Sequence, residues 1–453
     1  MTSKKILAVI LAAVMLVPMF MLGANAENAE YTIVSPYKDV IWEGDNAWGA
    51  YKGTLHTHTT YSDAELDLPI MIKGYYNEDY DFVANADHGV TGVEWNKEPA
   101  RPILYLYQYI LGNKVNHLTD EEYEAITTGT YPLEDGTIRN KKMVCVTGAN
   151  ELGYITLTKS HTNGYFLPAD VGNEWDAGEN SFEAAVKFVD ENGGLSHINH
   201  PGDWLDSNSN PDAVNDPENI EYFADILIRY DSCYGIEVFN EDNGPTGYDR
   251  ILWDNLLMYS LPYGKTILGY ANTDAHSESK VDSSFMTFMM EENNVENIRK
   301  TMTSGAFFST TRNLRANDYE IGPKVAIDAD NLGLAYPTFT KLVVDGHKIT
   351  VKVADADYIQ WIADGKVIYS ADITTDDEIV LDLDTIEGAE NFLYVRAEII
   401  GEGGITLTQA LTIDNGSEPL EYSSTEESFI TKFIKAFTSS LLYVIFQEII
   451  RAI

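Results

Sequence analysis

The chain has 453 residues, of which 44% are hydrophobic and 11% aromatic, so it has material for one large domain and a smaller one and is not a disordered chain. Its formal net charge of -41 would repel a polyanion, which argues against a nucleic-acid partner. The only two cysteines, Cys145 and Cys233, exclude a disulfide framework, so packing must hold the core.

The first 26 residues have the pattern of a secretory signal peptide. Two lysines precede an apolar run at 6–22, and Ala24-Asn25-Ala26 resembles a cleavage site. The sequence therefore predicts export to an extracellular or cell-surface location, with a mature chain that begins near Glu27. A retained N-terminal membrane anchor is the alternative, because the apolar run approaches the length that spans a bilayer.

Between about residue 48 and residue 312, short apolar runs alternate with amphipathic stretches, which predicts βα units around a parallel sheet. The expected strands cover 53–58, 82–87, 143–148, 195–199, 235–240 and 266–273. Apolar residues at helical spacing predict a helix over 182–189, with Asn180 as its N-cap and Gly193 near its end. The segments 91–142 and 201–222 are expected to be long loops or insertions, with a substrate rim as a role they could have.

After about residue 317 the pattern changes to apolar residues at every second position, which predicts a small β-sandwich. Asp345-Gly346 and Asp364-Gly365 are expected hairpin turns, and further strands are expected at 379–383, 392–399 and 405–413. The predicted organisation is thus a signal peptide at 1–26, a first module at 27–316, a β-sandwich-like domain at 317–416, and a linker with a C-terminal helix at 417–453.

The C-terminal helix, expected over 429–453, has its apolar residues on one face. Its charge-free run at 436–446 is short for a bilayer span, so peripheral contact with a membrane or a role in oligomerisation is favoured over insertion. Packing of this helix against its own protein is an equal alternative.

Histidines gather near the ends of the predicted strands of the first module. His56 and His58 lie two residues apart on a strand, so their imidazoles point to the same side, where they suit a divalent metal. The other imidazoles and carboxylates follow successive strands, where barrel active sites form: Asp63, Asp87, His88, Glu151, His161, His200, Asp274 and His276. Each residue alone has an ordinary structural interpretation, but together they indicate a shared metal site.

The order of these motifs resembles that of the PHP (polymerase and histidinol phosphatase) metallohydrolases. The matching motifs are His56-Thr-His58 with Ser62-Asp63, Asp87-His88, Glu151 with trailing His161, Asn199-His200-Pro201, and Asp274-Ala-His276. The Asn-His-Pro form, the segment 305–309 and the trailing β-module look more like the CehA/McbA branch. The resemblance implies an α/β fold, namely a distorted (β/α)7 barrel of PHP type followed by a C-terminal β-sandwich-like domain.

The same resemblance implies two or three divalent metal ions. By the family pattern, one ion would be held by His56, His58, Glu151 and Asp274, a second by Glu151, His161 and His200, and a third by Asp63, His88 and His276. Nitrogen and oxygen ligands without a thiolate admit Zn, Mn or Fe. Asp87 or His276 would orient the reactants or shuttle a proton, and His197, outside the pattern, is expected in a supporting or core position.

These features predict an exported metal-dependent hydrolase that uses a metal-bound hydroxide on a small-molecule substrate. A phosphoesterase is the first choice. A hydrolase of carboxylic esters, carbamates or amides is the second, because the segment at 305–309 has no arginine until Arg312. A non-catalytic, metal-stabilised binding module at the cell surface is the third. The candidate substrate-binding residues follow strand-end motifs: Tyr61, Trp204, Asn240 and Arg250.

Overall fold

The computed structural model describes residues 31–100, 104–153, 160–173, 181–241, 247–312, 333–373 and 378–423. The predicted signal peptide, the predicted C-terminal helix and Asn180 lie outside these residues. Within them, no helix combines the length and the apolar character that crossing a bilayer would require.

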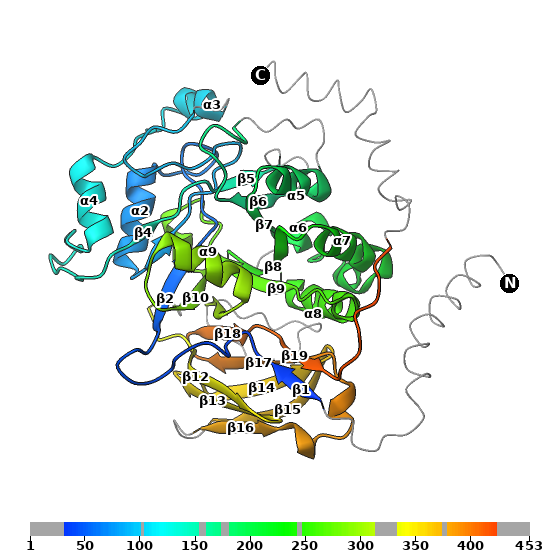
Figure 1. Ribbon diagram of the computed structural model, residues 1–453. Helices are drawn as coiled ribbons and strands as arrows, with labels where there is room; N and C mark the ends of the chain where they lie inside the picture. The colour runs from blue at the N-terminus through cyan, green and yellow to red at the C-terminus, as the bar shows by residue number, and fades with distance from the viewer. Residues whose placement is uncertain are drawn as a thin grey trace, which may run out of the picture.

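The part of the chain before residue 317 forms two sheets with helices packed around them (Figure 1). The first sheet contains β2 (Gly49–Thr54), β3 (Phe82–Val83), β4 (Val144–Cys145), β10 (Ser284–Met290) and β11 (Phe307–Thr311). The second contains β5 (Asn150–Leu152), β6 (Thr162–Tyr165), β7 (Leu195–Ile198), β8 (Cys233–Asn240) and β9 (Leu268–Asn272). Strands β2 to β4 and β7 to β9 pair in parallel, as the βα pattern predicts.

The fold is mixed α/β, and neither of these sheets closes on itself. In place of a continuous barrel ladder, the two sheets meet at isolated parallel bridges, Thr57 with Ala275 and His88 with Glu151. Strand β6 is antiparallel to both of its neighbours, β5 and β7, which interrupts the parallel pairing of a regular (β/α) repeat. A closed (β/α)7 barrel is therefore not what the described residues form.

The helices agree with the sequence pattern only in part. They are α2 (Leu68–Asn77), α3 (Leu104–Leu111), α4 (Asp120–Thr128), α5 (Phe182–Glu191), α6 (Pro201–Trp204), α7 (Pro217–Arg229), α8 (Asp249–Ser260) and α9 (Val295–Ser304). The predicted helix at 182–189 is confirmed as α5, but its N-cap is Ser181, whose hydroxyl accepts a hydrogen bond from the Ala184 amide, so the prediction of Asn180 was wrong.

Of the two alternatives for 91–142 and 201–222, long loops or insertions, the first was wrong, because α3, α4, α6 and part of α7 lie there. Local capping explains two of these helices. Thr119 and Glu122 form a reciprocal capping box at the start of α4, and Asp216 caps α7 ahead of a proline at its first position. Short 3-10 helices complete the inventory: η2 (Pro211–Asn215), η3 (Leu261–Tyr263), η4 (Glu278–Lys280), η5 (Leu383–Thr385) and η6 (Ala389–Asn391).

The strands after residue 333 pack as two layers around their own hydrophobic core. They are β12 (Thr338–Asp345), β13 (Lys348–Ala354), β14 (Tyr358–Ala363), β15 (Lys366–Asp372), β16 (Ile379–Asp382), β17 (Tyr394–Gly401), β18 (Gly404–Thr408) and β19 (Leu411–Asp414). Both predicted hairpins are confirmed, since β12 pairs with β13 across Gly346 and β14 pairs with β15 across Asp364-Gly365. Asp364 and Gly365 have φ values of 46° and 71°, as the tight turn requires.

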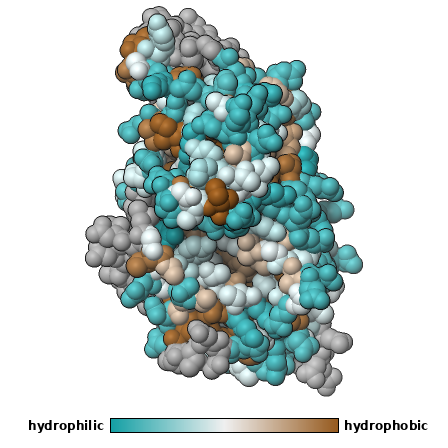
Figure 2. All heavy atoms as spheres, turned by 90° about the vertical axis from the view of Figure 1, so that its left-hand side faces the viewer, coloured by the Kyte–Doolittle hydropathy of each residue, from teal (hydrophilic) through white to brown (hydrophobic). Residues whose placement is uncertain are grey.

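One sheet crosses from the first part of the chain into the last. Strand β11 pairs with β18, so the first sheet continues into β17 and β19, and β1 (Thr32–Val34) pairs with β19 at its edge. Figure 1 accordingly shows β1 among the C-terminal strands. The face of the molecule seen in Figure 2 is mostly hydrophilic, and its hydrophobic residues form small separate spots.

A buried ion-pair network joins α8 to β17. Arg396 is fully buried, and its Nε and Nη2 each donate to a carboxylate oxygen of Asp254 at 2.7 Å. Its Nη1 donates to Glu398 at 2.6 Å, and Arg250 donates to the other oxygen of Glu398 at 3.0 Å. The four charged side chains at this junction thus compensate one another directly.

Candidate metal centre

Two chain segments run side by side at the ends of β2 and β9. The Asp274 amide donates to the His56 carbonyl at 2.9 Å, and the His58 amide donates to the Ala275 carbonyl at 3.1 Å. Because alternate residues of an extended segment face the same side, this pairing brings the side chains of His56, His58 and Asp274 together.

The ligand atoms of the first group, His56, His58, Glu151 and Asp274, lie close to one another. The Nε2 atoms of His56 and His58 are 3.1 Å apart, and Asp274 Oδ1 lies 3.2 Å and 3.0 Å from them. Glu151 contributes Oε1 at 3.4 Å from His56 and Oε2 at 3.1 Å from His58. A cation with bonds of about 2.1 Å would hold tetrahedral ligands about 3.4 Å apart, so these separations suit a metal ion.

Glu151, on β5, is the centre of the whole cluster. It is fully buried, and imidazoles from five different histidines surround its carboxylate. Besides His56 and His58, the nearest nitrogens belong to His88, His161 and His200, each 3.2 Å from one of its oxygens. His88, Glu151 and His161 form a second group that could hold a metal ion.

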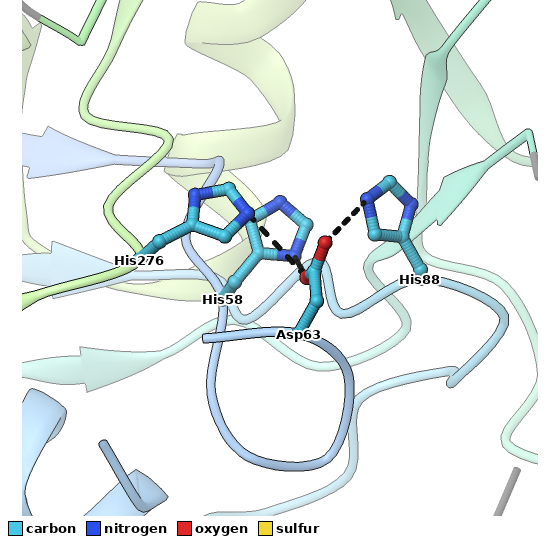
Figure 3. Close-up of side chains that lie close together, drawn as sticks. All are labelled: His58, Asp63, His88 and His276. Atoms are coloured by element: carbon cyan, nitrogen blue, oxygen red, sulfur yellow. Dashed lines mark ion pairs between the residues drawn. The ribbon is translucent and has the colours of Figure 1, made fainter. Parts of the chain in front are cut away.

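Figure 3 shows a third group, in which Asp63 lies between His88 on one side and His58 and His276 on the other. Asp63 Oδ1 is 3.4 Å from His276 Nε2 and 3.7 Å from His58 Nδ1, and its Oδ2 is 3.7 Å from His88 Nε2. The side chains of His276 and Asp63 are 34% and 18% exposed, whereas His56, His58 and Glu151 are inaccessible. Solvent therefore reaches the cluster from the side of this group.

Several buried atoms of the cluster lack hydrogen-bond partners among the described residues, and these include Glu151 Oε2, Asp274 Oδ1 and His88 Nδ1. Both oxygens nevertheless lie within 3.1 Å of a His58 nitrogen. The side chains thus converge on shared points, and whether these contacts become hydrogen bonds depends on which imidazoles are protonated. Buried polar atoms are rarely left unpaired, so cations would complete this arrangement.

The structure thus brings together all nine residues that the sequence predicts as metal ligands. The grouping differs from the expected one in two respects, because His58 also belongs to the third group and His88 takes the place of His200 in the second. His88 lies beside Glu151 as well as Asp63, while His200 Nε2 lies between Glu151 and Asp274, 3.8 Å from Asp274 Oδ2. His88 and His200 are therefore both within reach of the second group.

Asp87, a predicted catalytic residue, lies behind the cluster. Its carboxylate accepts hydrogen bonds from the Thr59 amide at 2.7 Å, the Thr59 hydroxyl at 2.8 Å and the Ser62 hydroxyl at 2.7 Å. The Ser62 hydroxyl in turn lies 3.2 Å from His58 Nδ1. Asp87 can therefore orient His58 through Ser62, whereas His276, the other predicted catalytic residue, lies at the solvent side of the cluster.

Of the predicted substrate-binding residues, one lies directly at the cluster. The Asn240 amide donates to Asp274 Oδ2 at 3.1 Å. Tyr61 is buried in the core around α2, and Trp204 stacks on Tyr222 with ring centroids 5.4 Å apart. Arg250 donates to Glu398 in the network at the β17 junction. A role in substrate binding remains a prediction for all four residues.

Glu237, on β8, is a site residue that the sequence analysis missed. Its carboxylate lies 2.8 Å from His56 Nδ1 and 3.4 Å from His197 Nε2, and it is fully buried. One signal could have revealed it, because Glu237 is the only charged residue in the otherwise apolar strand segment 233–240, and glutamate is rarely buried without a partner. His197 also stacks on Tyr270, which places it in the supporting position that its sequence context predicts.

The carboxylates keep several of the imidazoles protonated when no cation is bound. Burial and the charge of His276 lower the pKa of His58, but hydrogen bonds to Asp274 and Glu151 outweigh them and raise it to about 9. Burial likewise opposes protonation of His200, and Glu151 raises its pKa to about 9. His88 is the exception, because burial lowers its pKa to about 4.

Metal binding should therefore release protons. At pH 7 the metal-free protein carries protons on His58 and His200 that a cation must displace, so we expect the apparent metal affinity to rise with pH up to about 9. Calorimetric titration of chelator-treated protein with Zn²⁺, in two buffers of different ionisation enthalpy, measures the protons released. Binding at pH 7 without proton release would contradict this expectation.

The sequence matches no protein-family model and no curated protein. Among solved structures, the chain is similar to a two-domain protein from Bacteroides vulgatus that is described as containing a predicted PHP-like metal-dependent phosphoesterase. The two chains are 14% identical, with a TM-score of 0.39, and the match covers 83% of this chain and 99% of that one. The resemblance of this chain to the PHP family rests on its motifs. The narrower likeness to the CehA/McbA branch stays a prediction.

Two further structures match over little more than half of this chain. The lesion-specific endonuclease PfuEndoQ from Pyrococcus furiosus matches at 13% identity and a TM-score of 0.32, over 56% of each chain. A protein from Bifidobacterium adolescentis, assigned by prediction as a metal-dependent phosphoesterase, matches at 13% identity and a TM-score of 0.29, over 57% of this chain and 98% of that one. Because these TM-scores are low, the functional inference is drawn from the side chains of the cluster and not from these structures.

Proposed function

We propose that this protein is a metal-dependent hydrolase, and that phosphate esters of small molecules are its substrates. The observation that carries the proposal is the convergence of eight imidazoles and carboxylates into three adjoining groups, with His200 beside Glu151 as a ninth candidate. Divalent cations held there would lower the pKa of a bound water and offset negative charge on substrate oxygens. Adjacent cations suit phosphate esters in particular, because the charge on the transferring group is spread over several oxygens.

The protein's own side chains would order this site. Asp87 would hold His58 through Ser62, and Asn240 would hold Asp274. His276, the most exposed of the ligand candidates, lies where a proton could pass between the site and solvent. A distorted barrel of PHP type is part of the proposal, since the bridges Thr57–Ala275 and His88–Glu151 join the two sheets at this cluster.

A second candidate function, hydrolysis of carboxylic esters, carbamates or amides, has its own support. Among the described residues, the carboxylates of Asp63, Glu151 and Asp274 have ion-pair contacts with histidines and none with lysine or arginine. Arg312 and Arg250 contact Asp282 and Glu398 instead. From the described residues alone, a phosphate monoester would thus meet no arginine clamp there, which a neutral ester does not need.

Side-by-side assays separate these candidates. Protein loaded with Mn²⁺ or Zn²⁺ is expected to hydrolyse nitrophenyl phosphate and bis-nitrophenyl phosphate faster than nitrophenyl acetate, relative to the rates of the metal ions alone. Turnover of the acetate without turnover of either phosphate would overturn the phosphoesterase proposal in favour of the second candidate. Tight metal binding without turnover of any of the three would favour a metal-stabilised binding module.

Export is a separate proposal that rests on the signal-peptide pattern of residues 1–26. It places the hydrolase outside the cytoplasm, at the cell surface or in the medium. Peripheral membrane contact through the predicted C-terminal helix is proposed on the apolar face of that helix alone.

A further inference from the structure

Glu237 lies at the meeting point of three strand ends that carry candidate metal ligands. Its side chain is inaccessible to solvent, and both of its oxygens accept hydrogen bonds. Oε1 faces His56 Nδ1 at 2.8 Å and accepts from Asn272 Nδ2 at 2.9 Å, and Oε2 accepts from the His200 amide at 3.0 Å and Asn240 Nδ2 at 2.9 Å. With its acceptor positions occupied in this way, Glu237 is suited to orient ligands and not to bind a cation itself.

The contact with His56 fixes which nitrogen faces the cluster. A carboxylate can only accept, so the hydrogen bond to Glu237 places the imidazole proton on Nδ1. The lone pair of Nε2 then points toward Asp274 and Glu151, which lie 3.2 Å and 3.4 Å away. A carboxylate behind an imidazole also makes that imidazole a stronger ligand.

The contact with His200 acts through the main chain. His200 has a φ of 27°, a left-handed conformation that is unfavourable for a residue other than glycine. The hydrogen bond from its amide to Glu237 Oε2 holds the backbone in this conformation. The ring of His200 is thereby kept 3.2 Å from Glu151.

The third contact reaches Asp274 through Asn240. The two protons of the Asn240 amide are shared between Glu237 Oε2 and Asp274 Oδ2, at 2.9 Å and 3.1 Å. Asp274 also has a left-handed backbone, with a φ of 42°. Its carboxylate is thus held from the side that faces away from His56 and His58.

We propose that Glu237 is a positioning residue that sets three metal ligands at once, namely the ring of His56, the backbone of His200 and, through Asn240, the carboxylate of Asp274. The inference rests on the proposed metal centre. Through Glu237, strand β8 would fix the positions of the ends of β2, β7 and β9 relative to one another.

The test compares Glu237→Gln with the unmodified protein and with Asp81→Asn. Glutamine keeps the shape of the side chain but has an amide nitrogen, a donor, in place of one carboxylate oxygen. That nitrogen must face the donors on one side, either His56 and Asn272 or His200 and Asn240, and the hydrogen bonds on that side are lost. Asp81 is an equally buried carboxylate of the same module, bonded to the Lys52 amide at 2.9 Å, and it contacts no candidate ligand. Metal affinity is measured by competition with a chromogenic chelator, and ligand geometry by the visible spectrum of the Co²⁺-loaded protein.

We expect Glu237→Gln to weaken metal binding about 10- to 100-fold and to change the Co²⁺ spectrum, while Asp81→Asn changes neither. Unchanged affinity and spectrum in Glu237→Gln would overturn the inference, as would equal losses in both variants. If Glu237→Gln does not fold, Asn240→Leu tests the branch to Asp274 by the same two readouts, with the same result expected. Failure of the unmodified protein to bind metal would instead overturn the proposed function.

Discussion

Replacing Glu151 with glutamine is expected to remove most of the bound metal and to lower hydrolytic turnover by at least about a hundredfold. The reason is the central place of this carboxylate, which has five imidazoles within 3.4 Å and belongs to two of the three ligand groups. Glutamine keeps the size but removes the negative charge and cannot bridge two cations through two oxygens. Removing a metal ligand should reduce metal affinity and turnover by more than the 10- to 100-fold that is typical when a residue that only supports a ligand is removed.

Elemental analysis and the nitrophenyl assays together check this result. Glu191→Gln is the matched control, because Glu191 is an exposed glutamate at the end of α5 and should leave metal content and turnover unchanged. His58→Ala and Asp274→Ala are expected to resemble Glu151→Gln. A Glu151→Gln protein with full metal content and full activity would show that the cluster is not the working site.

Breaking the buried network between α8 and β17 should have the largest effect on stability. In Asp254→Leu, Arg396 loses both hydrogen bonds at 2.7 Å and keeps only Glu398, which it shares with Arg250. Removing one partner of a buried ion pair costs about 3–5 kcal/mol, because the other charge is left without compensation. We expect the Tm of the metal-free protein to fall by on the order of 5–10 °C.

The double variant Asp254→Leu with Arg396→Met is the informative control. It removes both charges of the pair, so it should regain much of the lost stability, since apolar replacement of a whole buried pair is often neutral. The exposed ion pair between Lys187 and Glu191 provides the comparison. Glu191→Gln breaks this pair and should change the free energy of unfolding by less than about 1 kcal/mol. A single Asp254→Leu variant as stable as the unmodified protein would contradict the assigned importance of this junction.

The residues of the candidate site were largely accessible to sequence reasoning because their spacing has local consequences. His56 and His58 face one side because side chains alternate along an extended chain, and this holds in any fold that makes the segment extended. The Asp345-Gly346 and Asp364-Gly365 hairpins were predictable for a similar reason, since the turn conformation favours these residue types. Helices α4 and α7 also have local signals, in their caps, but an apolar pattern alone does not reveal them.

Glu237 shows what such local patterns cannot give. Its sequence neighbours mark Glu237 as a lone charge in a buried strand but do not identify its partners, because His56, His200 and Asn272 lie up to 181 residues away along the chain. The antiparallel insertion of β6 and the pairing of β11 with β18 are equally remote from any short-range signal. Which strands pair depends on how the complete chain packs, and every element contributes to that packing.

The amino-acid sequence by itself determined which side chains are able to bind cations, because imidazoles and carboxylates at the ends of alternating apolar runs are a property of the chain. Only the tertiary structure decided how these ligands are shared, with Glu151 at the centre and Glu237 behind three of them. The physical reason is that the identity of a ligand is chemical and local. Its distance from other ligands depends on which strands pair, and that is fixed only when the whole chain packs.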